Sequence, residues 1–373
     1  MGSLEARPGD PRAAGFDGPD ATLELPPDAT RTAERIWDLA FTHRGERLVA
    51  CGETGVERFT AALEPLGREL EGVRCVQVLT HGDEVWVHAL AGSRHAPVSE
   101  LYRLGAEGAR RVRTFDRVHL LSIDAGGRML ARDTTLDAEH RTDRVLHPDG
   151  TDALVRDLGR FDAFNHSVRV DHRSELWFLR GTPPASHQAK TLCVVEADGT
   201  VRTALAWDEG TSHRMEACAT ATGDGALVTG YRLHHPHPGK GERWIACRPL
   251  DGGPATWRVR WPWAPVALTS VPTLGLVLVA TLDGRLAALD RATGECLASE
   301  VLAAGTRVSP LCLAVAGTRA AVGTLDGRIL RLDLGGTRHA VRRPPPDGLH
   351  PHGSREPATD RPAGMVGSGK LTG

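Results

Sequence analysis

The stretch Thr281-Leu-Asp-Gly-Arg-Leu286 recurs 43 residues later as Thr324-Leu-Asp-Gly-Arg-Ile329. Each copy follows one run of apolar residues and precedes another. Asp and Gly tolerate the positive φ of a tight turn, so each copy predicts two short antiparallel strands joined by a hairpin. A repeat of this length that holds several short strands is typical of one blade of a β-propeller.

Weaker copies of the same outline lie upstream. Leu39 to Phe59 alternates strand-like runs with a Gly turn and a Thr-Gly turn. Across the chain we expect seven such units, beginning near residues 36, 74, 117, 163, 213, 264 and 307. No amphipathic helix longer than residues 58–70 interrupts them, which favours an all-β class. We predict a single all-β propeller of seven blades, with six or eight as alternatives because units two to five rest on weaker outlines.

The composition also predicts domain boundaries. Residues 1–20 and 338–373 are rich in Gly and Pro without periodicity, and we expect both to be disordered tails. The propeller then occupies residues 21–337. Its seventh unit holds three strands before Gly335, whereas residues 21–26 alternate apolar and polar side chains. We expect residues 21–26 to add the outer strand of the last blade and close the ring.

Two stretches resemble known propeller repeats. Leu39 to Phe59 resembles the body of a WD40 repeat, and Leu282 to Leu297 is closer to the pyrroloquinoline-quinone-like repeat of quinoproteins. The Gly-His and Trp-Asp pairs of a typical WD40 repeat are missing, since Trp37-Asp38 opens a strand instead of ending one. The resemblance implies the propeller fold and no particular subfamily. The quinoprotein resemblance raises a quinone-dependent dehydrogenase, but the chain lacks the export signal and adjacent cysteines usual in those enzymes.

The bulk properties limit the partners. A formal net charge of −2 argues against nucleic acid and anionic membranes as partners, because both require a clustered basic field. The basic residues are almost all arginine, which is typical of a GC-rich bacterial genome. The seven cysteines contain no C-x-x-C pair, so the sequence suggests neither a disulfide framework nor a zinc knuckle. Several lie inside apolar strand-like runs, where we expect free cysteines to act as small buried side chains. The N-terminal residues lack the apolar core of a signal peptide, so we expect a cytoplasmic protein.

Known catalytic templates are missing. The sequence contains no G-x-S-x-G, H-E-x-x-H, Walker A or G-x-G-x-x-G motif in a suitable context. The Asp-Gly pairs are interpreted as turn residues. The densest histidine cluster, His234-His-Pro-His237, lies in a Gly/Pro-rich stretch without Cys or a carboxylate shell, so we interpret it as a solvated loop. We therefore predict no catalytic, cofactor-binding or metal-binding residues and no cofactor.

The stretch Trp257-Arg-Val-Arg-Trp-Pro-Trp263 alternates aromatic and basic residues. In a strand, Trp257, Val259 and Trp261 share one face and Arg258 and Arg260 the other. Exposed, these residues would form a binding hot spot for a partner or nucleic acid. We favour the alternative, in which the tryptophans of an outer strand fill the wedge between two blades.

Two functions fit these observations. The first is a non-enzymatic scaffold for protein–protein interactions in a bacterial multicomponent system. It binds another protein on one face of the propeller near the central channel, with loops 133–147, 181–190 and 232–243 as specificity elements. The second is a hydrolase or lyase whose histidines converge with acidic residues at the channel. Its candidate residues lie near blade starts or turns: His43, His81, His119, His166, His172 and His213. The sequence identifies no small-molecule ligand.

Overall fold

A computed structural model describes the greater part of the chain. The described residues are 21–24, 35–42, 45–81, 84–92, 97–124, 127–133, 142–147, 156–160, 166–167, 170–171, 175–181, 190–196, 198–206, 214–222, 225–234, 242–250, 253–304 and 306–335. Within these ranges the secondary structure is β only, and no helix of the length and hydropathy needed to cross a bilayer occurs. The predicted tails, residues 1–20 and 338–373, lie outside the described residues.

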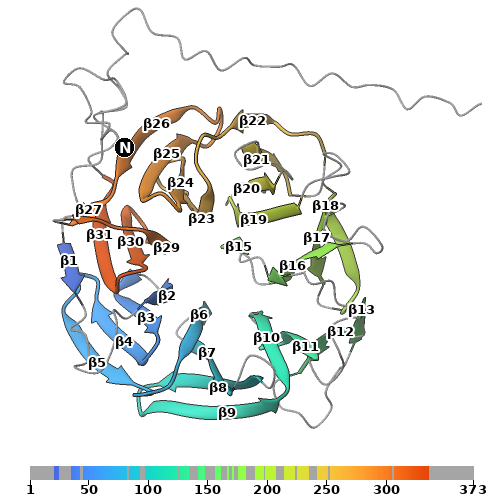
Figure 1. Ribbon diagram of the computed structural model, residues 1–373, viewed down its shortest axis with the longest axis vertical. Helices are drawn as coiled ribbons and strands as arrows, with labels where there is room; N and C mark the ends of the chain where they lie inside the picture. Colours follow the sequence, from blue (N-terminus) through green and yellow to red (C-terminus); the bar gives the residue numbers. More distant parts are fainter. Residues whose placement is uncertain are drawn as a thin grey trace, which may run out of the picture.

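Seven β-sheets surround a central axis as the blades of a propeller (Figure 1). Blade 1 contains β2 (Ile36–Phe41), β3 (Arg47–Gly52), β4 (Gly55–Thr60) and β5 (Pro65–Glu69). Blade 2 contains β6 (Cys75–His81), β7 (Glu84–Gly92), β8 (Pro97–Gly105) and β9 (Gly108–Asp116). Blade 3 contains β10 (Val118–Ile123), β11 (Met129–Asp133), β12 (Thr142–Leu146) and β13 (Arg156–Arg160).

The next three blades follow the same order from the centre outward. Blade 4 contains β14 (His166–Ser167), β16 (Leu176–Gly181), β17 (Lys190–Val195) and β18 (Val201–Ala206). Blade 5 contains β19 (Arg214–Ala221), β20 (Ala226–His234), β21 (Glu242–Pro249) and β22 (Trp257–Arg260), and β15 (Val170–Asp171) pairs in parallel with β19. Blade 6 contains β23 (Pro265–Val271), β24 (Leu276–Thr281), β25 (Arg285–Asp290) and β26 (Cys296–Val301).

Blade 7 is built from two distant parts of the chain. Its inner three strands are β29 (Pro310–Ala316), β30 (Arg319–Thr324) and β31 (Arg328–Asp333). Its outer strand is β1 (Ala21–Glu24), which runs antiparallel to β31 with Ala21 opposite Arg331. A two-stranded hairpin of β27 (Ala303–Ala304) and β28 (Thr306–Arg307) lies in the connection between blades 6 and 7. The ring is thus joined where β1 meets β31.

The predicted fold class is confirmed, and so are the blade positions. Each first strand begins within three residues of its predicted start, the largest differences being at His166 and Pro310. Residues 58–70 hold the end of β4, a turn and β5, with no helix. The predicted domain limits at residues 21 and 337 stay predictions, because the flanking segments lie outside the described residues.

The hydrophobic core consists of clusters between neighbouring blades. The seven clusters of buried residues each join two adjacent sheets, one for every interface around the ring. All six residues of β24 are buried, because this strand packs against a neighbour on both faces. This explains the continuous apolar runs that precede the Asp-Gly turns.

Polar side chains also join neighbouring blades. The buried carboxylate of Asp38 in β2 accepts a hydrogen bond from the Leu39 amide (2.9 Å) and another from the Val78 amide of blade 2 (2.9 Å). The Thr80 hydroxyl donates back to the Phe41 carbonyl at 3.0 Å. The inner strands of blades 1 and 2 are therefore held by both apolar packing and hydrogen bonds.

The antiparallel blades give the ring two distinct faces. We call the upper face the side with the connections between second and third strands and between successive blades. These connections bond to one another, since the Leu282 amide donates to Ala264 O (2.9 Å) and the Leu325 amide to Ser309 O (2.8 Å). The lower face carries the remaining connections, which are joined by bonds such as Arg291 N to Gly275 O (3.0 Å).

Candidate protein-binding surface

The repeated Thr-Leu-Asp-Gly-Arg motif forms a tight turn on the upper face of blades 6 and 7. In blade 6 the Thr281 hydroxyl donates to Asp283 Oδ1 (2.5 Å), and the Arg285 amide donates to Thr281 Oγ1 (3.2 Å). Gly284 has a φ of +86°, a value that glycine adopts without strain. The side chains of Thr281 and Asp283 thus shape the turn, so the interpretation of this Asp-Gly pair as turn residues is confirmed.

The second copy repeats this geometry. In blade 7 the Thr324 hydroxyl donates to Asp326 Oδ1 (2.6 Å), and the Arg328 amide donates to Thr324 Oγ1 (2.8 Å). The Arg328 Nε donates to Asp326 Oδ2 at 2.9 Å. Partial burial acts to raise the pKa of Asp326, but hydrogen bonds from Arg328 and Thr324 outweigh it and the pKa lies below its ordinary value. Asp326 therefore carries a negative charge that Arg328 compensates.

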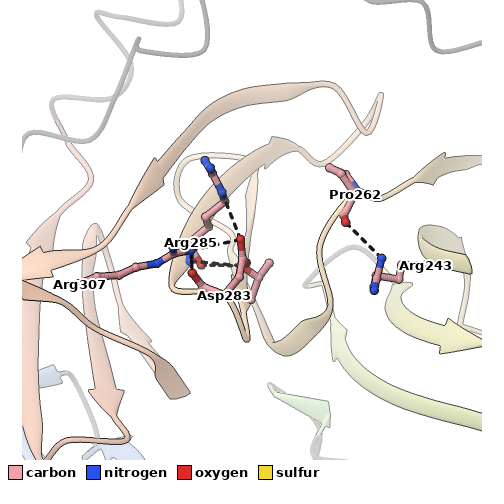
Figure 2. A network of polar contacts seen from close by, with 6 residues as sticks. Arg243, Pro262, Asp283, Arg285 and Arg307 are labelled. Atoms are coloured by element: carbon pink, nitrogen blue, oxygen red, sulfur yellow. Dashed lines mark hydrogen bonds and ion pairs between the residues drawn. The ribbon is translucent and has the colours of Figure 1, made fainter. Parts of the chain in front are cut away.

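Asp283 differs from Asp326 because two arginines share it. Its Oδ2 lies 3.4 Å from Arg285 Nε and 3.4 Å from Arg307 Nη2, and Arg307 also donates to the Asp283 carbonyl (Figure 2). Arg307 belongs to β28 in the connection to blade 7, and its side chain is 55% exposed. The contact joins blade 6 to the connection that follows it and leaves two guanidinium groups against one carboxylate.

Large apolar side chains are exposed beside these turns. Leu282 is 52% exposed and Leu325 42%, and both occupy the position between Thr and Asp in the repeated motif. Val301, at the end of β26, is 40% exposed and lies opposite Arg285 in the sheet. These three belong to a set of only four large apolar residues exposed in the described part of the chain; the fourth, Leu66, lies in β5 of blade 1. We call the area formed by Leu282, Val301, Leu325 and Arg307 the 6–7 surface.

The connection between blades 5 and 6 adjoins the 6–7 surface. Trp261 is buried, and Trp263 packs against it with an edge contact at 5.5 Å between ring centroids. The Arg285 guanidinium lies over the Trp263 ring at 4.5 Å. On the other side, Arg243 Nη1 donates to the Pro262 carbonyl at 3.3 Å (Figure 2). The Trp263 ring thus positions Arg285, and the Pro262 carbonyl positions Arg243.

The tryptophan-rich stretch fills the gap between blades, as we favoured. Trp257 and Val259 are partly buried and pack with blade 6, whereas Arg258 and Arg260 are exposed. The Trp257 indole donates to the Arg291 carbonyl of blade 6 at 2.8 Å. The packing interpretation of Trp257 is therefore confirmed, because its ring is an anchor between blades 5 and 6.

The strands that flank the predicted specificity loops meet those loops on the upper face. Residues 134–141, 182–189 and 235–241 lie outside the described residues, but the strands that flank them are described. Each loop connects the second strand of its blade to the third, as the Thr-Leu-Asp-Gly turns do in blades 6 and 7. The described strand ends that flank the loops therefore lie on the face that carries the 6–7 surface, and the role of the loops stays a prediction.

The candidate histidines are only partly described. His43, His172 and His213 lie outside the described residues, and so do residues 235–237 of the histidine cluster. His81 ends the inner strand β6, whereas His119 and His166 lie near the starts of β10 and β14, toward the opposite face. The backbone thus separates His81 from the other two. Among the described residues, no three His, Cys, Asp or Glu side chains group as a metal site would require.

Other nucleophilic or titratable groups are part of the core. His88 is buried, with Nε2 3.1 Å from Ser99 Oγ, and that oxygen accepts a hydrogen bond from the Leu120 amide of blade 3. The cysteines are free, and burial raises the pKa of the Cys75 and Cys218 thiols to about 12. These thiols stay protonated at neutral pH and serve as packing groups.

The 6–7 surface was missed in the sequence. The signal that could have revealed it is the leucine inside each repeated turn, a position where polar residues are usual. An open depression on the lower face, lined by Arg202, Gly225, Pro249 and Leu250, offers less chemistry, because Arg202 is already paired with Glu196 at 2.7 Å.

Comparisons with known proteins identify the architecture. No family model and no curated protein matches the sequence. Among solved structures, the chain is similar to Raptor of Chaetomium thermophilum, with a TM-score of 0.59 and 10% identity over 86% of this chain and 29% of that one. It is also similar to a chain of the mitotic checkpoint complex, with a TM-score of 0.57 and 13% identity over 90% of this chain and 99% of that one.

These likenesses concern the fold alone, because the identities are low, and the chain spans less than a third of Raptor. Together with the observed sheets, they show that the chain folds as a β-propeller of seven blades.

Proposed function

We propose that this protein is a non-enzymatic scaffold that binds another protein on its upper face, with the 6–7 surface as the point of contact. We propose further that it works within a multicomponent system in the bacterial cytoplasm. The observation that carries the proposal is that three of the four large apolar side chains exposed in the described part of the chain, Leu282, Val301 and Leu325, lie on one face of blades 6 and 7. Arg285 and Arg307, which share Asp283, lie on the same face. Grouped apolar side chains in a polar rim are characteristic of protein interfaces.

The residue types support the same conclusion. Arginine and tryptophan are enriched among residues that dominate binding energy, and here Arg285 lies over Trp263 next to Leu282. One of the similar structures is a chain within a checkpoint complex, which is an assembly of proteins. A propeller offers a rigid platform for such contacts because adjacent blades are joined through packed clusters.

Site-specific photo-cross-linking in the native cells tests the proposal. A photoreactive amino acid placed at residue 282 or 325 is expected to give a discrete protein adduct. The same amino acid at Leu66 is the matched control, because Leu66 is equally exposed at 49% but lies in blade 1. Adducts that are absent at 282 and 325, or that are identical at 66, would rule out this surface.

A further inference from the structure

The chemistry of the 6–7 surface defines the kind of protein segment that fits it. We propose that the bound segment is acidic and carries at least one leucine-like side chain, so that its carboxylates meet Arg285 and Arg307 while its apolar side chains cover Leu282 and Leu325. This inference rests on the proposed function and adds the chemical class of the partner.

The group of Asp283, Arg285 and Arg307 carries one more positive than negative formal charge. Asp283 lies within ion-pair distance of both Arg285 and Arg307, so one of these two cations has no compensating carboxylate in the group. The neighbouring pair of Asp326 and Arg328 is neutral. A carboxylate from a partner would complete the charge balance around Asp283, and the half-exposed Arg307 side chain is the group that it reaches first.

The connection between blades 5 and 6, together with Arg243 of the neighbouring β21, has more hydrogen-bond donors than acceptors. Arg243 donates to the Pro262 carbonyl, while the buried Nε of Arg243 and the buried indole nitrogen of Trp261 have no hydrogen-bond acceptor within the described part of the chain. Buried N–H groups without acceptors add positive potential to the surface above them. They act in the same direction as the arginines and favour a negatively charged segment.

The arginines are held in place before a partner binds. Arg285 lies over the ring of Trp263, and Arg307 donates both to the Asp283 carbonyl and to its carboxylate. Guanidinium groups fixed in this way lose little rotamer freedom on binding. Ordered cations beside exposed leucines suit a segment that combines acidic and aliphatic residues.

Nucleic acid fits the same surface poorly. The carboxylates of Asp283 and Asp326 stand among the arginines and repel phosphates, and the exposed leucines have no counterpart in a phosphate backbone. A protein segment matches both the charge and the apolar area. Binding of nucleic acid is therefore one of the contrary results that the experiment below can detect.

The test is selection of peptides from a random 15-residue display library against the full chain. Enriched peptides are expected to share an aliphatic residue flanked by at least two Asp or Glu. Fluorescence anisotropy then measures their affinity for variants. Leu282→Ser with Leu325→Ser should weaken binding by about tenfold or more, and Arg307→Ala should weaken it several-fold, as expected for truncated interface anchors.

Matched controls separate the surface from general effects. Leu66→Ser removes an equally exposed leucine, and Arg111→Ala removes an arginine whose side chain is 59% exposed and paired with Glu100 at 3.0 Å. Both variants should bind the peptides as the unmodified protein does. The thermal midpoint of every variant is measured beside the affinity, so a folding defect is recognised.

Each contrary result has a distinct meaning. Peptides that depend on Leu282 and Leu325 but carry no acidic residues would overturn the acidic segment and leave the proposed function intact. Selection that enriches no peptide dependent on these leucines would overturn both. Binding of a single-stranded 20-nucleotide DNA that is lost in Arg307→Ala would overturn the inference in favour of nucleic acid.

Discussion

At the scale of single residues, buried polar side chains join neighbouring blades by hydrogen bonds, which are directional, whereas apolar packing is not. Asp38 is the clearest case, because its carboxylate accepts amide hydrogens from its own strand and from Val78 in the next blade. Trp37-Asp38 resembles the signature pair of a WD40 repeat, but the structure uses Asp38 inside an inner strand. The pair therefore serves to join blades.

Asp38→Ala is expected to lower the free energy of unfolding by about 1–3 kcal/mol, because the buried Val78 amide loses its acceptor. Urea denaturation followed by circular dichroism measures the change. Asp333→Ala is the control, since within the described part of the chain the exposed Asp333 accepts the local Gly335 amide and no bond from another blade, and it should change stability by less than about 0.5 kcal/mol. Equal effects of the two substitutions would argue against a special role for Asp38.

The depressed pKa of Asp326 predicts a pH dependence. The ionised form is favoured in the folded state, so its contribution is complete above the ordinary aspartate pKa of about 4 and is lost as pH falls through the lower folded value. Asp326→Asn should therefore melt below the unmodified protein at pH 7, with a difference that shrinks toward pH 3. Thermal melts across this range give the measurement, and a difference that grows in acid would contradict the assignment.

At this scale the sequence predicted turn chemistry but not exposure. Thr-Leu-Asp-Gly-Arg indicated a hairpin because Asp and Gly act locally. The exposure of Leu282 and Leu325 depends on how far each turn projects from the face of the ring. The alternation of apolar and polar residues along a strand does not predict the exposure of a residue in a turn. The two arginines that meet at Asp283 come from different connections, so their meeting depends on the tertiary fold.

At the scale of strands and turns, close contacts between blades limit which residues are tolerated. Trp257 of β22 lies directly against Gly294, in the turn between β25 and β26. A Cβ atom added at Gly294 would lie 2.5 Å from Trp257 Cε3. Residue 294 must therefore be glycine for two reasons: a side chain would collide with Trp257, and the backbone has a positive φ of +72°.

Gly294→Ala should destabilise the protein by about 1–3 kcal/mol more than Gly317→Ala. Both glycines have a similar positive φ, +72° and +63°, so the backbone strain of alanine is shared. Only Gly294 faces a ring, whereas an added Cβ at Gly317 meets nothing within 4 Å. Urea denaturation of the two variants isolates the steric part, and equal losses would show that Trp257 moves aside freely.

The outer strand of blade 7 gives a prediction for an entire element. Deleting residues 1–28 removes β1 and leaves the β31 edge without its ladder, so the thermal midpoint should fall by several degrees. Deleting residues 1–20 alone keeps β1 and is expected to leave the midpoint unchanged. Differential scanning calorimetry compares the two, and matching midpoints would show that β1 does not stabilise the ring.

The elements were largely predictable because apolar runs and Gly turns are local signals. The starts of all seven blades followed from them. The parallel pairing of β15 with β19 and the small hairpin of β27 and β28 were not predicted, because strands of two residues carry no periodic pattern. Their pairing is imposed by the neighbouring blades.

At the scale of the whole molecule, the hydrophobic core and the proposed binding surface lie in different parts of the ring. The core lies between blades, while the 6–7 surface lies on turns that contribute few buried apolar atoms. Leu282→Ser with Leu325→Ser is therefore expected to leave the thermal midpoint within about 1 °C of the unmodified protein, because substitutions at exposed sites have small effects. A clear fall of the midpoint, measured by calorimetry, would show that these leucines support the fold.

The pairing of β1 with β31 has a consequence for synthesis on the ribosome. Translation reaches Glu24 early and Arg328 late, and at about 5–20 residues per second the interval lasts some tens of seconds. During this time β1 has no partner strand within its own chain, and six blades can form as an open arc with bare edges. The nascent polypeptide thus stays open to chaperones or to another nascent chain until the last strand emerges.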